Sequence, residues 1–215
     1  MRTKFGALLI GVAVVAACDD TSGPAESGGT VRVVNATSAP LEAVVAGRAA
    51  TVGAATVSEP IAIGEGAQRV QLRAGTATSE VTVSAPPGLA AVAVALPAAG
   101  GLSARALEDT GGVVPAGKSK LRVAHLAPNA PPVEIWRTQP DFPAPVPIVA
   151  NEPHPYQLVS PYLQSDAGSW EVFVTPAGST TRLVSTGALA IPAGQRRTVV
   201  LLDSAGVLRL RVIAE

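Results

Sequence analysis

The stretch LRVAHLAPNAPPVEIW, from Leu121 to Trp136, decides how this sequence is interpreted. Apolar and other residues alternate on either side of a Pro-rich turn, which is the pattern of two short strands joined by a loop. A weaker copy, VRVVNATSAPLEAVV, runs from Val31 to Val45 in the first half of the chain. The two copies predict one structural unit that is used twice.

The order of the later segments supports this duplication. Val70 to Arg73 corresponds to Glu171 to Val174, and Ala90 to Leu96 corresponds to Gln195 to Leu201. Short apolar runs separated by Gly- and Pro-containing turns, at spacings of roughly 8–12 residues, are typical of β-sandwiches. The run AAVAVAL at Ala90 to Leu96 is continuously apolar, so we expect a central strand buried on both faces. The predicted fold is all-β, with two tandem Ig-like β-sandwich units.

Composition shifts and turn residues give the expected domain boundaries. The Gly- and Pro-rich segment that connects the two units is the best candidate domain boundary. The sequence leaves open whether the two units move freely relative to each other. Residues 138–161 form a Pro-rich insertion that we expect to run as an extended surface loop. The predicted parts are a signal peptide at 1–17, a flexible tether at 18–29, a first unit at 30–110, a linker at 111–118 and a second unit at 119–215.

The first residues have the features of an export signal. Arg2 and Lys4 precede an apolar run that is too short to span a bilayer but has the length of a signal-peptide core. The pattern Val15 to Cys18, VAAC, resembles the bacterial lipobox, in which the cysteine thiol is acylated and becomes the new amino terminus. Several acyl chains together anchor a protein stably. We therefore expect an exported protein, lipid-anchored at Cys18 to the inner or outer membrane.

Composition excludes several classes of function. The chain has 16 basic and 16 acidic residues, a formal net charge of zero, so it lacks the basic surface that a nucleic-acid partner requires. Its single Cys excludes intrachain disulfides and cysteine-based metal sites. Only 15% of the residues are charged and aromatic residues are few, which fits thin β-layers packed with Val, Leu and Ile.

The opening stretch of the second unit resembles the first motif of the DUF4397 family, approximately R-x-x-H-x-S-P-D-A-P-x-V-D-V-Y. The sequence matches this motif at Arg122, His125, Pro128, Ala130 and Val133. It departs from the motif at Ala127, Asn129, Glu134 and Trp136, and the first unit, with Asn35 at the His position, departs further. The resemblance implies an exported or lipid-anchored β-rich protein, often in tandem copies, with a sandwich fold and no established activity.

His125 is the residue with the most obvious chemical potential. It could be a ligand or general base, because imidazole titrates near neutral pH. It could equally organise the Pro-Asn-Ala-Pro turn through its ring nitrogens, as Asn35 could in the first unit. A metal site would need His125, His154 and a carboxylate such as Glu134, Glu152 or Asp166 to converge, and no metal-binding spacing is present. We predict no catalytic, cofactor-binding or metal-binding residues.

Aromatic residues border the Pro-rich segment of the second unit. They could pack that segment onto the sandwich, or they could form a ligand surface on its loops. Trp170 and Phe173 lie in a predicted strand and are assigned to the core. The possible ligand surface consists of His125, Trp136, Phe142, Tyr156 and Tyr162.

These features predict a lipid-anchored protein of the cell envelope that acts as a non-catalytic binding, adhesion or structural module. Its partners would be the membrane and an envelope polysaccharide or protein. One alternative is an envelope hydrolase acting on surface polymers, which would show a deep pocket with a His beside a carboxylate. Another is a scaffold subunit that uses an exposed sheet edge. A binding module would instead show a shallow aromatic surface.

Overall fold

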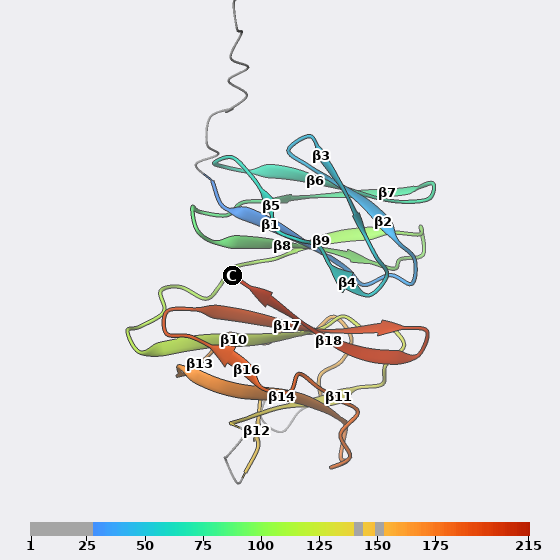
Figure 1. Cartoon of the computed structure of the whole chain (residues 1–215). Coiled ribbons are helices and arrows are strands. Elements are labelled where there is room, and N and C mark those ends of the chain that lie inside the picture. Colours follow the sequence, from blue (N-terminus) through green and yellow to red (C-terminus); the bar gives the residue numbers. More distant parts are fainter. Residues whose placement is uncertain (1–27, 140–143, 149–152) are drawn as a thin grey trace, which may run out of the picture.

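The computed structural model describes residues 28–139, 144–148 and 153–215, and these residues form only strands and connecting loops. The chain is therefore all-β, as the sequence predicts (Figure 1). Within these ranges no helix is long and apolar enough to cross a membrane. The predicted signal peptide, Cys18 and residues 18–27 of the tether lie outside the described residues.

The first half of the chain forms a sandwich of two sheets. The sheet that faces the second half, called the first inner sheet, has the order β4 (Thr56–Val57), β1 (Thr30–Asn35), β8 (Ala90–Leu96) and β9 (Ser103–Leu107), and β5 (Ile61–Ala62) also pairs with β1. The first outer sheet has the order β3 (Arg48–Val52), β2 (Leu41–Val45), β6 (Gln68–Ala74) and β7 (Ala77–Val83). β1 runs parallel to β8, whereas β8 and β9 are antiparallel.

The second half forms another sandwich with a closely similar strand order. Its second inner sheet has the order β13 (Leu163–Asp166), β10 (Lys118–His125), β17 (Arg196–Ser204) and β18 (Val207–Ala214). Its second outer sheet has the order β12 (Val146–Pro147), β11 (Val133–Thr138), β14 (Gly168–Pro176) and β15 (Val184–Ser185), and β16 (Leu189–Ile191) also pairs with β14. β10 runs parallel to β17, as β1 does to β8.

Alternation along the strands fills a core inside each sandwich. In β6, Val70 and Leu72 are buried in the first core, while Arg69 and Arg73 on the opposite face are exposed. The same alternation in the second sandwich buries Val, Leu and Ile residues of β10, β11, β14 and β17. Burying one such side chain is worth roughly 1.5–3 kcal/mol, so period-two patterning determines which face of each sheet points inward.

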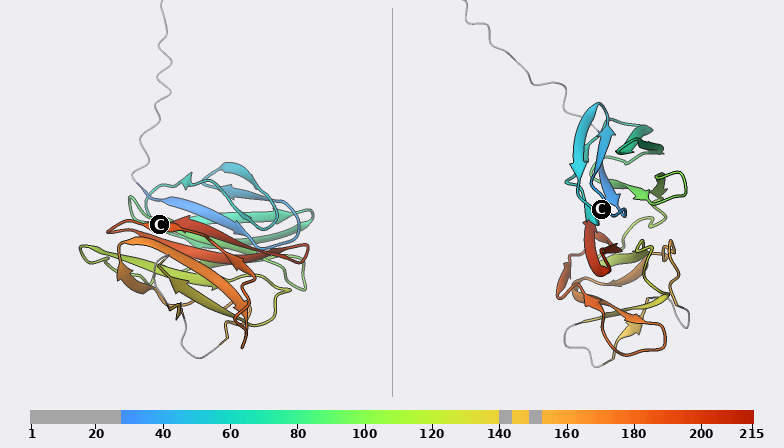
Figure 2. Two further views of the ribbon diagram at one scale, coloured as in Figure 1. Left: turned by 60° about the horizontal axis from the view of Figure 1, so that its bottom comes forward. Right: turned by 90° about the vertical axis from the view of Figure 1, so that its right-hand side faces the viewer.

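A third core, called the middle core, joins the two sandwiches. Val92 and Val94 of β8 pack there with Val200 and Leu202 of β17 and with Ile213 of β18. Both inner sheets are thus covered on both faces, and the molecule is a stack of four sheets (Figures 1 and 2). The expectation that β8 is a central strand buried on both faces is confirmed.

Cationic side chains of the second inner sheet hold the connection between the sandwiches. Lys120 and Arg122 of β10 and Arg196 of β17 reach the connecting segment. Their acceptors there are the main-chain oxygens of Glu108, Gly111, Gly112 and Val113 and the carboxylate of Asp109. The middle core and these bonds together join the two sandwiches.

The Pro-rich insertion is more ordered in its described parts than a surface loop. Val146 and Pro147 form the edge strand β12 beside β11, and the bonds of His154 with Val133 make an isolated bridge. An edge position suits proline because its missing N–H faces away from the ladder. Farther along, Ser160 is buried and its N–H donates to the Val123 carbonyl at 2.8 Å. The expectation of an extended surface loop is therefore wrong for His154 and Ser160, which are buried.

The described chain begins in a narrow gap in the first sandwich. The N–H of Gly29 donates to the Ala85 carbonyl at 3.2 Å, and its carbonyl accepts from the Ile63 N–H at 3.1 Å. A Cβ on Gly29 would lie 2.5 Å from the carbonyl oxygens of both Pro86 and Leu89. Only glycine fits there, so the fold begins at residues that the sequence analysis assigns to the tether.

Candidate functional site

The residues of the predicted ligand surface do not form one site. Phe142 lies outside the described residues. His125 and Tyr156 are neighbours, with ring centroids 6.3 Å apart in an edge-on arrangement. Tyr162 packs against Arg122 near the linker, whereas Trp136 lies on the second outer sheet. Each of these three places has its own chemistry.

His125 is the last residue of β10, is fully buried and organises the turn that follows. Its Nδ1 accepts a hydrogen bond from the Ala127 N–H at 3.3 Å, and its Nε2 lies 3.5 Å from the Pro131 carbonyl oxygen. Burial lowers the pKa of His125, which favours the neutral imidazole that such an acceptor requires. These contacts fit the role of a turn organiser.

Asn35 makes the corresponding bond at the end of β1. Its Oδ1 accepts from the Thr37 N–H, two residues ahead, at 2.9 Å. Its amide group donates to the carbonyls of Ala39, Val52 and Gly53. A side chain that accepts a hydrogen bond from the backbone N–H two residues later stabilises a turn. Asn35 and His125 therefore have the same role in stabilising the turn after the first strand of their units.

Two buried serines that the sequence analysis missed also occupy equivalent places. Ser58 Oγ accepts from the Val33 N–H at 2.9 Å, and Ser160 Oγ accepts from the Val123 N–H at 2.9 Å. Each hydroxyl then donates to the carbonyl of the next residue, Glu59 or Pro161. Both serines satisfy a main-chain donor of the first strand of their unit. The sequence signal for both is a Ser close before a Pro, two residues before Pro60 in the first unit and one residue before Pro161 in the second.

His154 differs from His125 in the environment of its ring. Its main chain bridges to Val133, but both ring nitrogens are buried without a hydrogen-bond partner in the described structure. Burial and the nearby His125 lower the pKa of His154 from 6.5 to about 4. The imidazole is therefore neutral at neutral pH.

We expect acidification to weaken the fold through His154. Because its pKa is lowered from 6.5 to about 4 on folding, the unfolded chain binds a proton as the pH falls below 6.5 while the native chain does not. The free energy of unfolding should fall by about 2–3 kcal/mol from this residue between pH 7.5 and pH 4.5, and this loss should level off as the pH falls below 4. Urea denaturation of the wild type and His154→Leu at both pH values measures it. Equal pH dependence in the two proteins would contradict the assignment.

Tyr162 belongs to a buried polar cluster beside the linker. The Arg122 guanidinium lies 4.5 Å from the centre of its ring and 3.0 Å from the carboxylate of Glu215, to which the Tyr162 hydroxyl also donates. Burial, followed by the charge of Glu215, raises the pKa of Tyr162 well above its usual range. The Tyr162 hydroxyl is engaged inside the protein, so this place fits a structural role.

The aromatic surface lies instead on the outer face of the second outer sheet. Trp136 of β11 and Phe173 of β14 are direct cross-strand partners, and their rings stack with centroids 6.4 Å apart and planes 11° from parallel. The Arg182 guanidinium covers Phe173, 4.0 Å from the centre of the ring. Aromatic pairs of this kind contribute roughly 0.5–1.5 kcal/mol beyond their burial.

A groove of about 300 Å³ runs along these rings. Because β14 lies between β11 and β15, its residues Phe173 and Thr175 form the floor. Trp136 and Pro145 line one side, and the loop that follows β14 lines the other with Ser179, Thr180 and Arg182. Below, this seven-residue site is called the aromatic groove.

Local bonds hold the walls of the aromatic groove. The Trp136 Nε1–H donates to Thr175 Oγ1 at 3.1 Å, which fixes the indole. Glu134 Oε1 accepts from the Gly178 N–H at 3.0 Å and holds the loop after β14. Arg182 is paired with Glu171, with Nη1 and Oε1 2.8 Å apart. The groove is thus preformed by contacts within the protein.

The strand registers correct the sequence alignment of the two halves by one residue. Val44 pairs with Gln71 as Trp136 pairs with Phe173, so Gln71, not Leu72, is the counterpart of Phe173. A one-residue shift moves a strand side chain to the other face of its sheet. Phe173 is buried, as expected of a core residue, with 4% of its surface exposed. It lies on the outer face of the sheet, against Trp136 and beneath Arg182, and not in the core between the two sheets. Trp170 packs against the second core as predicted.

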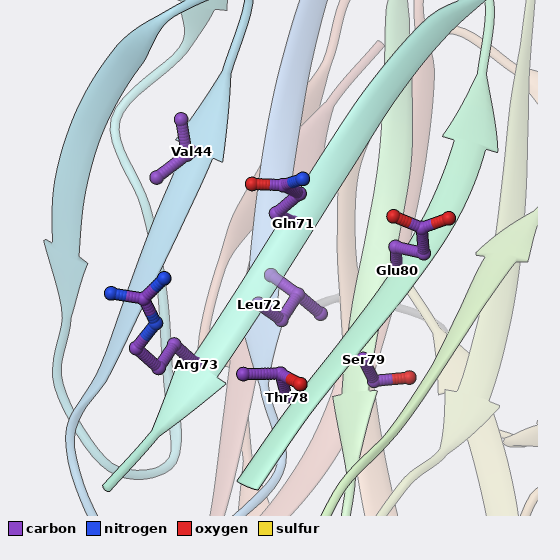
Figure 3. Close-up of a pocket in the computed structure, with 7 residues that line it drawn as sticks. All are labelled: Val44, Gln71, Leu72, Arg73, Thr78, Ser79 and Glu80. Carbon is purple, nitrogen blue, oxygen red and sulfur yellow. The ribbon is translucent and has the colours of Figure 1, made fainter. Parts of the chain in front are cut away.

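The equivalent face of the first sandwich is polar. A hollow of about 350 Å³ is lined there by Val44, Gln71 and Arg73, with Glu80 on the adjacent strand (Figure 3). The charged side chains pair across the strands, as in Arg73 with Glu42 at 3.9 Å. The two halves therefore present different chemistry at the same position, and only the second presents stacked aromatic rings.

The lining of the aromatic groove suits binding. Its described residues offer aromatic and proline surface, three hydroxyl side chains and one guanidinium, without a carboxylate, His or Cys. Across the described part of the chain, no three His, Cys, Asp or Glu side chains gather as metal ligands. Apolar surface with a few placed polar groups is the usual construction of a ligand site.

Comparison with solved structures finds distant likenesses, two of which are candidate cell adhesion proteins. A candidate cell adhesion protein from Bacteroides fragilis is 11% identical, with 87% of this chain and 98% of that chain covered and a TM-score of 0.27. A candidate cell adhesion protein from Bacteroides ovatus is 6% identical, with 87% and 97% covered and a TM-score of 0.29. None of the curated proteins compared with the chain matches it.

The model of one protein family covers the first sandwich, β10 of the second inner sheet and most of β11 in the second outer sheet. It matches residues 29–136, which is half of the chain and includes both copies of the stretch on which the sequence analysis is based. The protein therefore belongs to the family described as "Domain of unknown function (DUF4397)".

Proposed function

We propose that this protein is an exported, lipid-anchored protein of the bacterial cell envelope that binds a surface ligand without altering it chemically. The aromatic groove carries the binding part of this proposal, because Trp136 lies partly exposed in a preformed groove with polar groups at its rim. The apolar signal and the single cysteine, Cys18, at the end of it support the anchor.

The difference between the two halves supports a division of roles. β1 pairs with β8 in parallel as β10 pairs with β17, and Ser58 and Ser160 make equivalent hydrogen bonds to the first strand of their halves. These correspondences favour an origin by duplication. The second copy has the aromatic pair Trp136 and Phe173 where the first has Val44 and Gln71, and this difference reflects specialisation of the second copy for binding. The first copy serves as a spacer.

The placement of the aromatic groove supports this division. The described chain begins at the first sandwich, and β11 and β14 lie in the outermost layer at the opposite end of the stack (Figure 1). With the anchor at the N-terminal side, the groove would point away from the membrane, toward material at the cell surface.

The hydrolase alternative finds less support in the geometry. It calls for His125 or His154 beside a carboxylate in a deep pocket. The described contacts of His125 are with main-chain groups and with the Tyr156 ring, and the ring nitrogens of His154 contact no polar group of the described structure. We therefore propose the binding module.

One experiment separates the anchor from the binding activity. The wild type should carry acyl mass on a chain that begins at Cys18 and should partition into detergent, whereas Cys18→Ala should be unacylated and remain in water. The soluble Cys18→Ala protein should still co-sediment with washed envelope fragments. Adding Trp136→Ala should reduce that co-sedimentation at least tenfold, because it removes a wall of the groove.

The control is Val44→Ala in the same Cys18→Ala background, which changes the equivalent position of the first half and should leave co-sedimentation unchanged. Wild-type protein that is unacylated and still carries residues 1–17 would refute the anchor. Equal co-sedimentation of the Trp136→Ala and Val44→Ala proteins would refute the binding role of the groove.

A further inference from the structure

We infer that the ligand of the aromatic groove is a neutral polysaccharide built of pyranose rings. This inference rests on the binding role proposed above for the same groove. Three features of the groove carry it: the state of its indole N–H, the polar groups of its rim and its local charge.

The indole of Trp136 offers a ligand its ring surface and no hydrogen-bond donor. Its Nε1–H already donates to Thr175 Oγ1, and Thr175 is buried. A peptide docking on an aromatic groove presents main-chain carbonyls that need donors. A pyranose ring presents a face of C–H groups, which packs against an aromatic ring without that requirement. The occupied N–H therefore favours a sugar over a peptide.

The rim supplies the polar contacts that sugar hydroxyls require. Ser179 Oγ accepts from the Thr181 N–H at 3.1 Å, which orients the hydroxyl and leaves its proton available to a ligand. Thr180 is exposed beside it, and Arg182 has further N–H groups besides the one bonded to Glu171. Hydroxyl and guanidinium groups above an apolar floor match a molecule with apolar faces and polar edges.

The charge at the groove favours a neutral ligand. Arg182 is the charged residue among the described lining residues, and its guanidinium is paired with Glu171. An acidic sugar would have to compete with Glu171 for Arg182 and would be repelled by the Glu171 carboxylate 2.8 Å from that guanidinium. Neutral pyranose rings avoid both effects.

Two tryptophans in the whole chain make the test direct. In the full-length 15N-labelled protein, the Trp136 indole resonance reports on the groove. The Trp170 indole, whose N–H donates to Asp166 O at 3.0 Å on another part of the sheet, is the internal reference. The probes are cellohexaose, chitohexaose, a hexagalacturonate and a hexaproline peptide.

A neutral hexasaccharide should shift the Trp136 resonance saturably and leave Trp170 in place. By calorimetric titration, Trp136→Ala should weaken that binding at least tenfold, while Trp136→Phe should retain most of it and Val44→Ala should retain all of it. Tighter binding of the hexagalacturonate would overturn the preference for neutral sugars.

Two results separate this inference from the proposed function. A shift of Trp136 by hexaproline alone would overturn the sugar ligand but keep the groove as a binding site. If no probe shifted the Trp136 resonance, the sugar ligand would also be overturned. Co-sedimentation with envelope fragments that depends on Trp136 would then still show that the groove binds a ligand. If no probe shifted the Trp136 resonance and co-sedimentation did not depend on Trp136, both the sugar ligand and the binding role of the groove would be rejected.

Discussion

Replacing Gly29 by alanine should lower the free energy of unfolding by about 3 kcal/mol, toward the upper end of overpacking effects. The added Cβ would lie 2.5 Å from two carbonyl oxygens and 2.6 Å from the Ala85 Cβ. These neighbours are backbone and a short side chain, so none can swing aside. Relief would require separating β1 from the turn at Pro86. Guanidinium denaturation of the full chain measures the effect.

The matched control is Gly100→Ala, in the turn before β9. A Cβ at Gly100 meets no atom within 4 Å, and its φ is not positive. The change should stay within about 0.5 kcal/mol of the wild type, because it alters only an exposed turn. If the Gly29 variant were as stable as this control, the close approach of the chain at Gly29 would have to be abandoned.

Arg122→Met should lower the free energy of unfolding by about 3–5 kcal/mol, the range for breaking a buried ion pair from one side. The side chains of Arg122 and Glu215 are each 3% exposed and lie 3.0 Å apart. Methionine fills much of the space but leaves the Glu215 carboxylate buried without a counter-charge. The bond from Arg122 to Glu108 O, which holds the linker, is lost as well.

A second substitution distinguishes lost charge pairing from lost packing. Adding Glu215→Gln to Arg122→Met removes the unpaired charge, so it should restore part of the lost stability. Arg105→Met serves as the reference for a superficial arginine, since its bond to Gln157 O is 3.4 Å long and exposed, and it should change stability by less than about 0.5 kcal/mol. A double variant no more stable than Arg122→Met would show that packing accounts for the loss.

Local patterns in the sequence account for most of the fold. Alternation and turn residues predict the all-β class and the double-sided burial of β8, since these depend on residues that are close in sequence. The bond from Thr37 to Asn35 is equally local. The burial of Phe173 also follows from its size, but the side of the sheet on which it lies does not. The two halves have low sequence identity, and an alignment error of one residue moves a strand side chain to the other face of its sheet.

The aromatic groove could be predicted only in part. The aromatic residues that flank the Pro-rich segment indicate Trp136 as a candidate binding residue. Its partners Phe173, Thr175 and Arg182 are set by strand pairing and by the loop after β14, and neither follows from composition. Tyr156 and Tyr162 share the same sequence context as Trp136, yet the chain carries them to the middle core and to the Arg122 cluster.

Through the middle core, each half of the chain buries an apolar face of the other. A half excised at the linker would present Val92, Val94 and their neighbours, or Val200 and Leu202, to water as an apolar face, and such faces promote aggregation. Recombination that exchanged one half for a foreign domain would have to match this face as well as the join. Because the two inner sheets share this buried layer, we expect a substitution on one of them to be tolerated only when it also fits the other.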